Sequence, residues 1–479
     1  MFSLSPLRML LIGFIASLSL FWVVGYIGLD PDFGWHIKVG ELIRTQGIPF
    51  TDPFSYTMPS YPFVDHEWLT NILMESLLNS TGKVGIAFLF AVMAALIPFI
   101  LLPPPYSVKE VIAALFLWSA IFFLVGVRPQ VLGWVFLAVL IRILLSKWEK
   151  NKWFLPLLML VWVNMHGSFV LGAAIVTFFI FFRMIKEKSI NWRDFILWVV
   201  TLGVTAINPY GIRMWEEALT VSSDIRLKWT ISEWQPPFMW PLITFPFFLF
   251  SALTGVLWWR FRSRVAYWKT FVAATLFLLA ISATRHTVLF VVFALPTCVL
   301  LLRYLEIEGT KYKGIEERVR NFFLVLLVVV LITYFSEGMV AFYSSLTKQE
   351  SGDYPQKAVA YLQKHSFQGE IFSNYNWGGY LIWKLPQKKV FVDGRMPSWK
   401  SNSPPEESNS AFQEYLEIVK GKNINETFQK YQVRYVLWPS QTNGGPISRN
   451  KFISFLEKED WETVYEDETA VVYRHPLLP

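Results

Sequence analysis

Residues 83–102 read KVGIAFLFAVMAALIPFILL, a run whose only charged side chain is its first. A helix that crosses the hydrocarbon core of a bilayer needs about 20 predominantly apolar residues, so this run is long enough. The whole chain has the same bias, since 54% of its 479 residues are hydrophobic and 16% are charged. A soluble globular protein does not need so much apolar surface to build its core. We therefore predict an integral membrane protein made mainly of helices.

Similar runs recur through most of the chain. We expect about eleven membrane spans, several of them short enough to be tilted or re-entrant segments inside a bundle. The predicted spans are residues 9–28, 83–102, 110–127, 131–146, 153–165, 168–184, 194–207, 240–259, 266–283, 287–303 and 321–337. The predicted fold class is a membrane all-α bundle followed by a soluble C-terminal segment.

Lysine and arginine divide unevenly between alternate loops. About 17 fall in one set of loops and about 8 in the other, and basic residues stay on the cytosolic side of a membrane. We therefore predict a cytosolic N-terminus and, after an odd number of spans, an extracytoplasmic C-terminus. The first run has no small-residue cleavage site before Leu29, so we expect an uncleaved anchor. The predicted location is the plasma or bacterial inner membrane.

The composition changes near Glu337. The segment 338–479 carries equal numbers of basic and acidic residues and has no long apolar run. Strand-like runs at residues 369–374, 389–393, 433–438 and 463–473 alternate with helical patterns at 355–365, 411–420 and 450–458. We predict an extracytoplasmic α/β domain over 338–479, after a transmembrane domain over 1–337. The net charge of +7 lies in the membrane part, where basic cytosolic loops account for most of it, so no nucleic-acid partner is indicated.

The loop between the first two predicted spans, residues 29–82, concentrates the polar motifs. It holds DPDFGWHI (residues 30–37), GIPFTDPFSY (47–56) and DHEWL (65–69). Aromatic belts are expected at a membrane interface, but carboxylates and histidines interleaved with tryptophans exceed what a belt requires. Carboxylates in such a place tend to be functional when partners are close. We expect the active residues in this loop.

Asp30 and Asp32 are two residues apart, a spacing that lets both approach one cation or one reacting hydroxyl in a non-helical loop. An inverting sugar transfer needs a carboxylate that takes the proton of the acceptor while a cation neutralises the leaving phosphate. For Asp30, an N-cap role ahead of Pro31 is an equal alternative. For Asp32 we favour the catalytic role.

Four of the six histidines, His36, His66, His166 and His286, fall at predicted outer ends of spans. With Lys38 and Glu67 they are candidates for phosphate contact or substrate hydrogen bonds. A divalent metal held by Asp32, His36, His66 and Glu67 is the alternative, since imidazole and carboxylate bind such ions. No HExxH-like spacing supports it, and the single cysteine excludes a cysteine-ligated site.

Two arginines, Arg128 and Arg285, lie in tight predicted outer turns between apolar runs. A charge in such a place is costly unless it is paired or used. Either guanidinium could hold a phosphate or diphosphate through forked hydrogen bonds. The alternative is that each side chain reaches to the interface without a ligand.

These motifs resemble those of bacterial multi-pass membrane proteins related to the GT-C glycosyltransferases. The resemblance rests on DPDxxWHI, IPxxDPFSYT and HEWL in the first loop and on the turns RPQ (128–130), NxHGS (164–168) and NPYG (208–211). It extends to YNWGGYL (375–381) and VDGR (392–395) in the C-terminal segment, so it covers most of the chain.

The resemblance implies a GT-C-like transmembrane domain, a polyprenyl-phosphate sugar as donor and transfer on the exterior face. The acceptor would be a glycan, a lipid or a protein. Asp32 matches the catalytic base, with Asp30 in support. Asp393 and Arg395 could line a sugar site, whereas we favour tight turns as the reason for the two glycines of YNWGGYL.

Two other functions compete. A transporter or lipid flippase would need polar groups along the middle of several spans and often internal repeats, and the sequence offers few such groups and no clear repeat. A non-catalytic scaffold would use its outer domain as a binding module.

Overall fold

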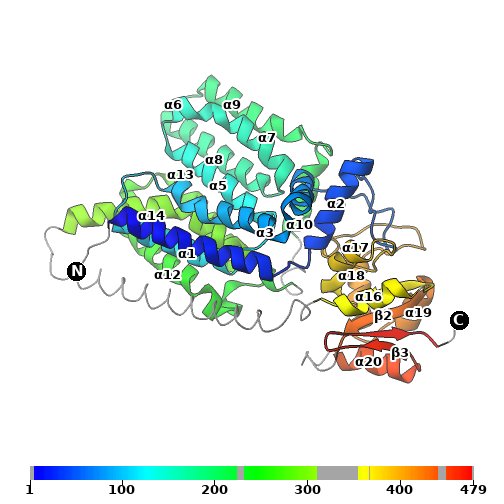
Figure 1. Ribbon diagram of the computed structural model, residues 1–479. Coiled ribbons are helices and arrows are strands. Elements are labelled where there is room, and N and C mark those ends of the chain that lie inside the picture. Colours follow the sequence, from blue (N-terminus) through cyan, green and yellow to red (C-terminus); the bar gives the residue numbers. More distant parts are fainter. Residues whose placement is uncertain (1–4, 224–230, 310–353, 366, 441–448, 477–479) are drawn as a thin grey trace, which may run out of the picture. The chain divides into compact units, whose positions relative to one another are not determined.

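The computed structural model describes residues 5–223, 231–309, 354–365, 367–440 and 449–476 (Figure 1). These residues are mostly helical and form two compact units. One, the helical unit, contains described residues 5–28 and 81–309, and the other, the sheet unit, contains 29–80 and 354–476. The sheet unit therefore joins the predicted first outer loop to the predicted C-terminal domain.

The helical unit begins with α1 (Pro6–Ile27), whose first turn is capped by Ser5 and has proline at its first position. A second long helix, α3 (Trp68–Leu101), is interrupted at Gly82, whose φ of 67° favours glycine. The part of α3 after this break belongs to the helical unit. The other helices are α4 (Val108–Phe122), α5 (Gln130–Leu145), α6 (Trp148–Asn151), α7 (Leu155–Met165), α8 (Phe169–Glu187), α9 (Trp192–Gly203), α10 (Arg213–Ser223), α12 (Pro241–Arg260), α13 (Tyr267–Ser282) and α14 (Thr287–Gly309).

Each predicted span from residue 9 to residue 303 coincides, within a few residues, with one of these helices. The last predicted span, 321–337, lies outside the described residues. By length and composition, five helices of the described chain could cross a membrane: α1, α3, α8, α12 and α14. Helices α5 and α13 are apolar but shorter, and α4, α7 and α9 have 15, 11 and 12 residues. The helices are confirmed, but eleven membrane spans are not.

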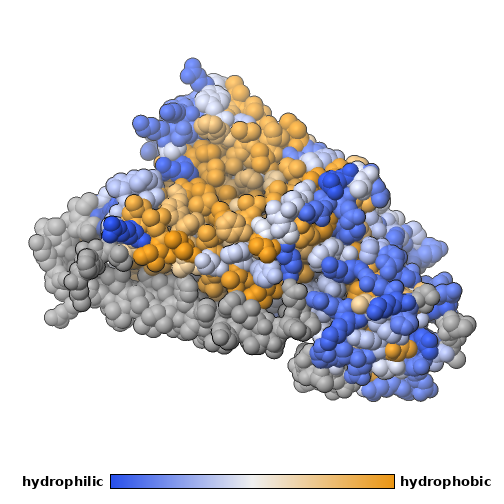
Figure 2. Space-filling model, in the orientation of Figure 1, coloured by the Kyte–Doolittle hydropathy of each residue, from blue (hydrophilic) through white to orange (hydrophobic). Residues whose placement is uncertain are grey.

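The surface of the helical unit is adapted to lipid. Large hydrophobic side chains such as Ile12, Leu157, Ile196 and Trp259 are exposed on it. Among the described residues of the sheet unit, Phe50 alone is an exposed large hydrophobic residue. Figure 2 shows the contrast: apolar side chains cover much of the visible face of the helices, and hydrophilic ones cover most of the sheet unit. Such extensive apolar exposure indicates association of the helical unit with a membrane.

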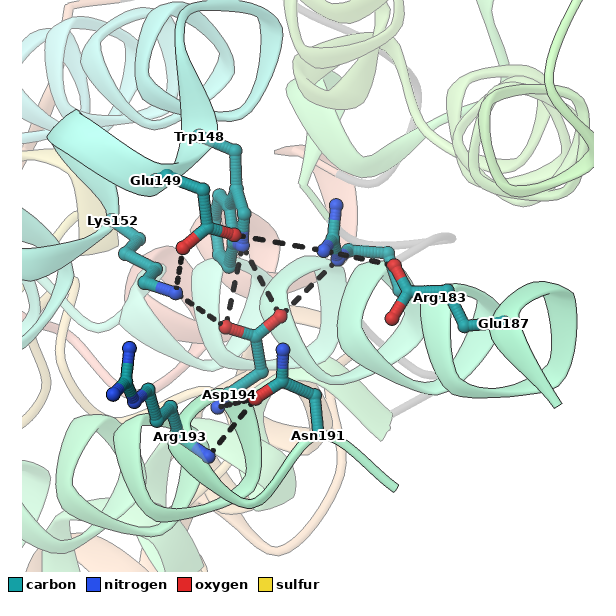
Figure 3. Close-up of polar contacts among 8 residues, drawn as sticks. All are labelled: Trp148, Glu149, Lys152, Arg183, Glu187, Asn191, Arg193 and Asp194. Carbon is teal, nitrogen blue, oxygen red and sulfur yellow. Dashed lines mark hydrogen bonds and ion pairs between the residues drawn. The ribbon is translucent and has the colours of Figure 1, made fainter. Parts of the chain in front are cut away.

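A buried ion-pair cluster joins α6, α8 and α9 (Figure 3). Lys152 Nζ lies 2.9 Å from Asp194 Oδ1 and 2.6 Å from Glu149 Oε2. Arg183 Nε contacts Asp194 Oδ2 at 3.3 Å, and Trp148 Nε1 donates to the same oxygen at 3.2 Å. The side chains of Lys152 and Asp194 are only 2% and 3% exposed. Lys152 and Asp194 can be buried as charged groups because each lies beside a side chain of opposite charge.

Replacing Asp194 by asparagine is expected to lower the free energy of unfolding of the helical unit by about 3 kcal/mol, because Lys152 loses its buried counter-ion. Thermal unfolding of the full chain in detergent measures the change. The control is Glu187→Gln, which breaks a half-exposed pair between Glu187 and Arg183 within α8 and should cost about 0.5 kcal/mol or less. Equal effects of the two changes would show that the buried cluster has no special role.

The sheet unit contains four strands, β1 (Glu370–Ser373), β2 (Val433–Pro439), β3 (Glu462–Glu466) and β4 (Ala470–Arg474), in the order β1-β2-β4-β3. Strand β1 is parallel to β2, and the other neighbouring pairs are antiparallel. Its helices are α2 (Phe33–Gln46), the start of α3, α16 (Gln356–Lys364), α17 (Gly378–Lys384), α18 (Ala411–Val419), α19 (Ile424–Lys430) and α20 (Arg449–Lys458). The small C-terminal sheet and the three predicted helices of this segment are confirmed.

Two strand predictions are wrong. The run 463–473 is not one strand but the hairpin of β3 and β4, in which Asp467 accepts hydrogen bonds from the backbone N–H groups of Thr469 and Ala470. The run 389–393 is not a strand of the sheet. Val390 instead forms a single bridge with Ser55 of the first loop and exchanges backbone hydrogen bonds with Phe54 and Tyr56.

One hydrophobic core serves both parts of the sheet unit. Trp35, Val39, Met58 and Phe63 from the first loop pack in the same cluster as Phe372 and the inner faces of β2 and β4. The first loop is thus a structural part of this unit. The predicted loop 29–82 and the described part of the predicted domain 338–479 pack together around one core.

Helices α2 and α17 approach closely at glycines. A side chain at Gly34 would collide with the carbonyl of Gly379, and one at Gly379 would collide with the carbonyl of Pro31. A side chain at Gly378 would meet the carbonyl of Val392. Because Gly378 and Gly379 begin α17, the tight-turn interpretation of the YNWGGYL motif is wrong. These glycines are needed for backbone contact.

Candidate functional site

Asp30 and Asp32 lie immediately before α2. The backbone N–H of Asp32 donates to Asp30 Oδ1 at 2.9 Å, and Asp32 occupies the N-cap position without capping the helix through its side chain. The alternative that Asp30 caps a helix starting at Pro31 is wrong, because α2 starts at Phe33. Asp30 supports the local backbone, and the carboxylate of Asp32 is not used as a cap.

The carboxylate of Asp32 lies directly against Gly394, where any larger residue would collide with it. Gly394 stands between Asp393 and Arg395 in the VDGR motif. The structure therefore brings the two acidic motifs together within the sheet unit, one from the first loop and one from the C-terminal segment.

Arg395 is buried between two carboxylates. Its Nη2 lies 2.7 Å from Asp393 Oδ2, and its Nη1 lies 2.8 Å from Asp52 Oδ1 in an ion pair that is not directed as a hydrogen bond. Burial works against its charge, but Asp393 and Asp52 outweigh this and hold the pKa of Arg395 above its usual value. The guanidinium also lies over three aromatic rings, those of Phe54, Phe63 and Trp399. Asp393 and Arg395 are thus engaged with the protein itself, as an anchor between loop and domain.

A second buried set connects His36 on α2 with the first turns of α3. His36 Nδ1 is 2.7 Å from Asn71 Oδ1, and Asn71 Nδ2 donates to Asp65 Oδ2 at 2.8 Å. Glu67 lies between two histidines, at 3.7 Å from His36 Nδ1 and 3.8 Å from His66 Nε2. The structure thus brings three predicted residues, His36, His66 and Glu67, into one polar cluster.

The carboxyl group of Asp65 in this cluster is strongly perturbed. Burial raises the pKa of Asp65 to about 6, although hydrogen bonds from the Glu67 backbone and Asn71 and the charge of Arg395 act in the opposite direction. A buried carboxyl whose pKa lies near neutrality is a frequent feature of functional sites.

Asp52, Asp65 and Asn71 were not among the residues predicted from the sequence. Asp52 and Asp65 stand within the quoted motifs, so their place beside the selected residues was a usable signal. Asn71 follows Asp65 by six residues and offers no pattern of its own.

The described residues contain no group of three or more histidine, cysteine, aspartate or glutamate side chains placed to hold a metal ion. In particular, Asp32, His36, His66 and Glu67 do not form one. His36 Nδ1 faces Asn71, and Glu67 is more than 3.5 Å from each imidazole nitrogen to which it pairs. Lys38 pairs with Glu41 at 2.7 Å within α2, which reduces its availability for a phosphate.

In the helical unit, Arg128 and Arg285 share one carboxylate. Arg128 Nη1 is 2.9 Å from Glu233 Oε2, and Arg285 Nη1 is 3.7 Å from Glu233 Oε1. Arg285 and Glu233 belong to the 3₁₀ turns η6 (Thr284–His286) and η3 (Ser232–Trp234). Arg285 stacks on Trp234, whose ring also meets His286. About a quarter to a third of each charged side chain is exposed.

The two arginines hold Glu233 in its ionised form. Burial would raise the pKa of Glu233, but Arg285 and Arg128 outweigh it and hold that pKa below its usual range. One carboxylate thus faces two guanidinium groups, and guanidinium groups also bind phosphate through charge-assisted hydrogen bonds.

Thr284, the residue before Arg285, lines a small apolar cleft. The cleft is lined by Ala120, Phe123, Leu124, Ile243, Thr244, Pro246, Phe247, Thr284 and Thr287. Thr284 precedes Arg285, and its backbone N–H and hydroxyl both donate to the carbonyl of Gln235, close in sequence to Glu233. The same turns therefore present guanidinium groups and an apolar surface.

His166 has local partners. Its Nδ1 lies 2.7 Å from Ser168 Oγ, which also accepts from Trp162 Nε1 at 3.0 Å. Both His166 and Ser168 pack against Gly133 of α5. These contacts give His166 a structural role at the junction of α5, α7 and α8.

The predicted site residues thus divide between the two units. Asp30, Asp32, His36, Lys38, His66, Glu67, Asp393 and Arg395 belong to the sheet unit, and Arg128, His166, Arg285 and His286 belong to the helical unit.

No protein-family model and no curated protein matches this sequence. The resemblance to the GT-C glycosyltransferases accordingly rests on the motifs alone.

Proposed function

We propose that the protein is an integral membrane glycosyltransferase that moves a sugar from a polyprenyl-phosphate donor to an acceptor on the extracytoplasmic face, with inversion. The observation that carries the proposal is the arginine pair Arg128 and Arg285, with an apolar cleft lined by Thr284, the residue before Arg285. A lipid phosphate needs a cation for its head and an apolar surface for its chain, and the exposed apolar side chains of the helical unit offer such a surface.

Within this proposal, Asp32 is the general base. Its carboxylate makes no cap hydrogen bond, and Asp30 fixes the backbone N–H beside it. Asp32 takes the proton of the acceptor hydroxyl. The acceptor is a glycan, a lipid or a protein.

The proposal includes about eleven spans, a cytosolic N-terminus and an extracytoplasmic sheet unit. The following ion pairs agree with the predicted alternation of loops, because each joins residues that the basic-loop count assigns to the same side. Lys152 pairs with Asp194, and Arg303 with Glu110, among predicted cytosolic residues. Arg128, Glu233 and Arg285 meet among predicted outer ones.

Substitutions in the arginine pair and in Glu233 should change the affinity for a lipid phosphate in opposite directions. Arg128→Ala and Arg285→Ala should each weaken binding of a polyprenyl phosphate about 10- to 100-fold, the value of a charge-assisted hydrogen bond. Glu233→Gln should strengthen binding, because it removes the internal competitor for the arginines. Binding to the purified full chain in lipid nanodiscs measures both.

The control is Arg213→Ala, an exposed arginine at the start of α10. Absence of polyprenyl-phosphate binding by the unaltered protein would favour the scaffold. Binding together with movement of the lipid between leaflets, and without sugar transfer, would favour the flippase.

A further inference from the structure

Asn71 stands at the centre of a buried hydrogen-bonded line from Asp65 to His36. Its Nδ2 donates to Asp65 Oδ2 at 2.8 Å, and its Oδ1 lies 2.7 Å from His36 Nδ1. The three residues are 0% to 4% exposed. Because an ionised carboxylate only accepts hydrogen bonds, Asp65 determines which end of the Asn71 amide faces it.

The orientation of Asn71 determines where His36 carries its hydrogen. An amide oxygen only accepts, so His36 Nδ1 must be the donor in this contact. This holds for the neutral ring and for the protonated ring, since Nδ1 bears hydrogen in both. Nε2 is therefore the nitrogen that gains and loses a proton.

His36 lies one helical turn after Asp32, the N-cap residue of α2. They are four residues apart, and the His36 N–H donates to the Asp32 carbonyl at 3.2 Å, which shows that the intervening turn is helical. Side chains at this spacing lie one above the other.

We propose that Asn71 is a positioning residue that, with Asp65, holds hydrogen on His36 Nδ1 so that His36 Nε2 receives the proton taken from the acceptor. The proton transfer rests on the proposed glycosyl transfer, whereas the placement of hydrogen on Nδ1 does not.

The step balances as follows. The acceptor oxygen forms a bond to the sugar carbon, its proton passes to Asp32, and the bond from that carbon to the phosphate oxygen breaks with its electron pair on phosphate. Asp32 then passes the proton to His36 Nε2, because an ordinary imidazole is a stronger base than an ordinary carboxylate. The imidazolium releases it to water, and both side chains return to their first state.

Several carboxyl groups lie near His36. Glu67 Oε2 lies 3.7 Å from Nδ1, with His66 on the far side of Glu67. Asp65 accepts the hydrogen bond from Asn71, and the charge of Arg395 acts on its carboxyl group. Asp32 is the N-cap residue of α2, the helix that carries His36. The Trp35 ring lies against the imidazole in a tilted arrangement, with ring centroids 3.6 Å apart. Negative charge thus surrounds the ring from α2 and from the start of α3.

The test is ¹⁵N NMR of the full chain labelled at histidine, with the His36 signals assigned by their loss in His36→Gln. The unaltered protein should show hydrogen on Nδ1 at high pH. Asn71→Leu should shift His36 toward the Nε2–H form that neutral histidine favours in water. Asn71→Asp, which keeps an acceptor oxygen, should restore Nδ1–H and move the midpoint of the pH profile of transfer up by about 1 pH unit.

Asn79→Leu is the matched control, since Asn79 lies on the same helix and donates to Glu75 instead. Hydrogen on Nε2 in the unaltered protein, or on Nδ1 in Asn71→Leu, would overturn the proposal. If Asn71→Leu fails to fold, the spectrum of the unaltered protein and Asn71→Asp still decide it. If the unaltered protein transfers no sugar, the proposed function fails while the spectrum still reports on Asn71.

Discussion

Asp32→Asn is expected to lower the rate of sugar transfer by about 10²- to 10⁴-fold, the usual contribution of a general base. The amide keeps the size of the side chain and its place against Gly394, but it cannot accept the acceptor's proton. Transfer of radiolabelled sugar from polyprenyl phosphate in membranes gives the rate. Protein yield and thermal unfolding should stay unchanged, because Asp32 does not cap α2.

Two neighbouring carboxyl groups serve as controls. Asp30→Asn keeps an oxygen that accepts from the Asp32 N–H, so it should reduce transfer much less. Glu41→Gln, which alters only the exposed pair with Lys38, should have no effect. Full activity of Asp32→Asn would remove Asp32 as the base.

Arg395→Met is expected to destabilise the sheet unit by about 3–5 kcal/mol, because two fully buried carboxylates, Asp52 and Asp393, then lack their counter-ion. A loss of this size approaches the whole stability of a small domain. Limited proteolysis of the full chain should then cut within residues 354–476 before it cuts the helical unit.

The matched control is Arg474→Met. Arg474 pairs with Glu462 across β3 and β4, and both side chains are about half exposed, so the expected cost is below 1 kcal/mol. A further variant that combines Arg395→Met with Asp52→Asn and Asp393→Asn should recover part of the stability. Unchanged protease resistance of Arg395→Met would contradict the anchoring role.

Apolar runs predicted the helices well because a long hydrophobic run has few other stable forms in a membrane protein. Helix boundaries near Ser5, Ser107 and Asn191 also follow from capping residues. The number of membrane spans did not follow, because helices as short as α7 and α9 meet the composition but not the length of a span.

The sheet unit was only partly predictable, because its packing joins distant segments. The run 389–393 has strand-like composition, but its partner is the segment 54–56, more than 300 residues earlier. Periodicity carries no signal for such a pairing. The collision of a Gly34 side chain with Gly379 is likewise set by the close approach of two helices, not by either local sequence.

The candidate site shows the same limit. Residue type and position singled out His36, Glu67, Arg128 and Arg285, since polar groups at predicted interfaces are few. Asn71 and Glu233 were not assigned roles. Only the folded chain shows that Asn71 contacts His36 and that Glu233 pairs with Arg128.

The central claim is that the protein transfers a lipid-linked sugar to an outer acceptor. Mass spectrometry of lipid-linked sugars and surface glycans, in cells with the protein, without it, and with Asp32→Asn, tests this most directly. We predict that one polyprenyl-phosphate sugar accumulates and one surface glycan loses that sugar, both without the protein and with Asp32→Asn. Unchanged lipid-linked sugars and glycans in cells that lack the protein would contradict the claim.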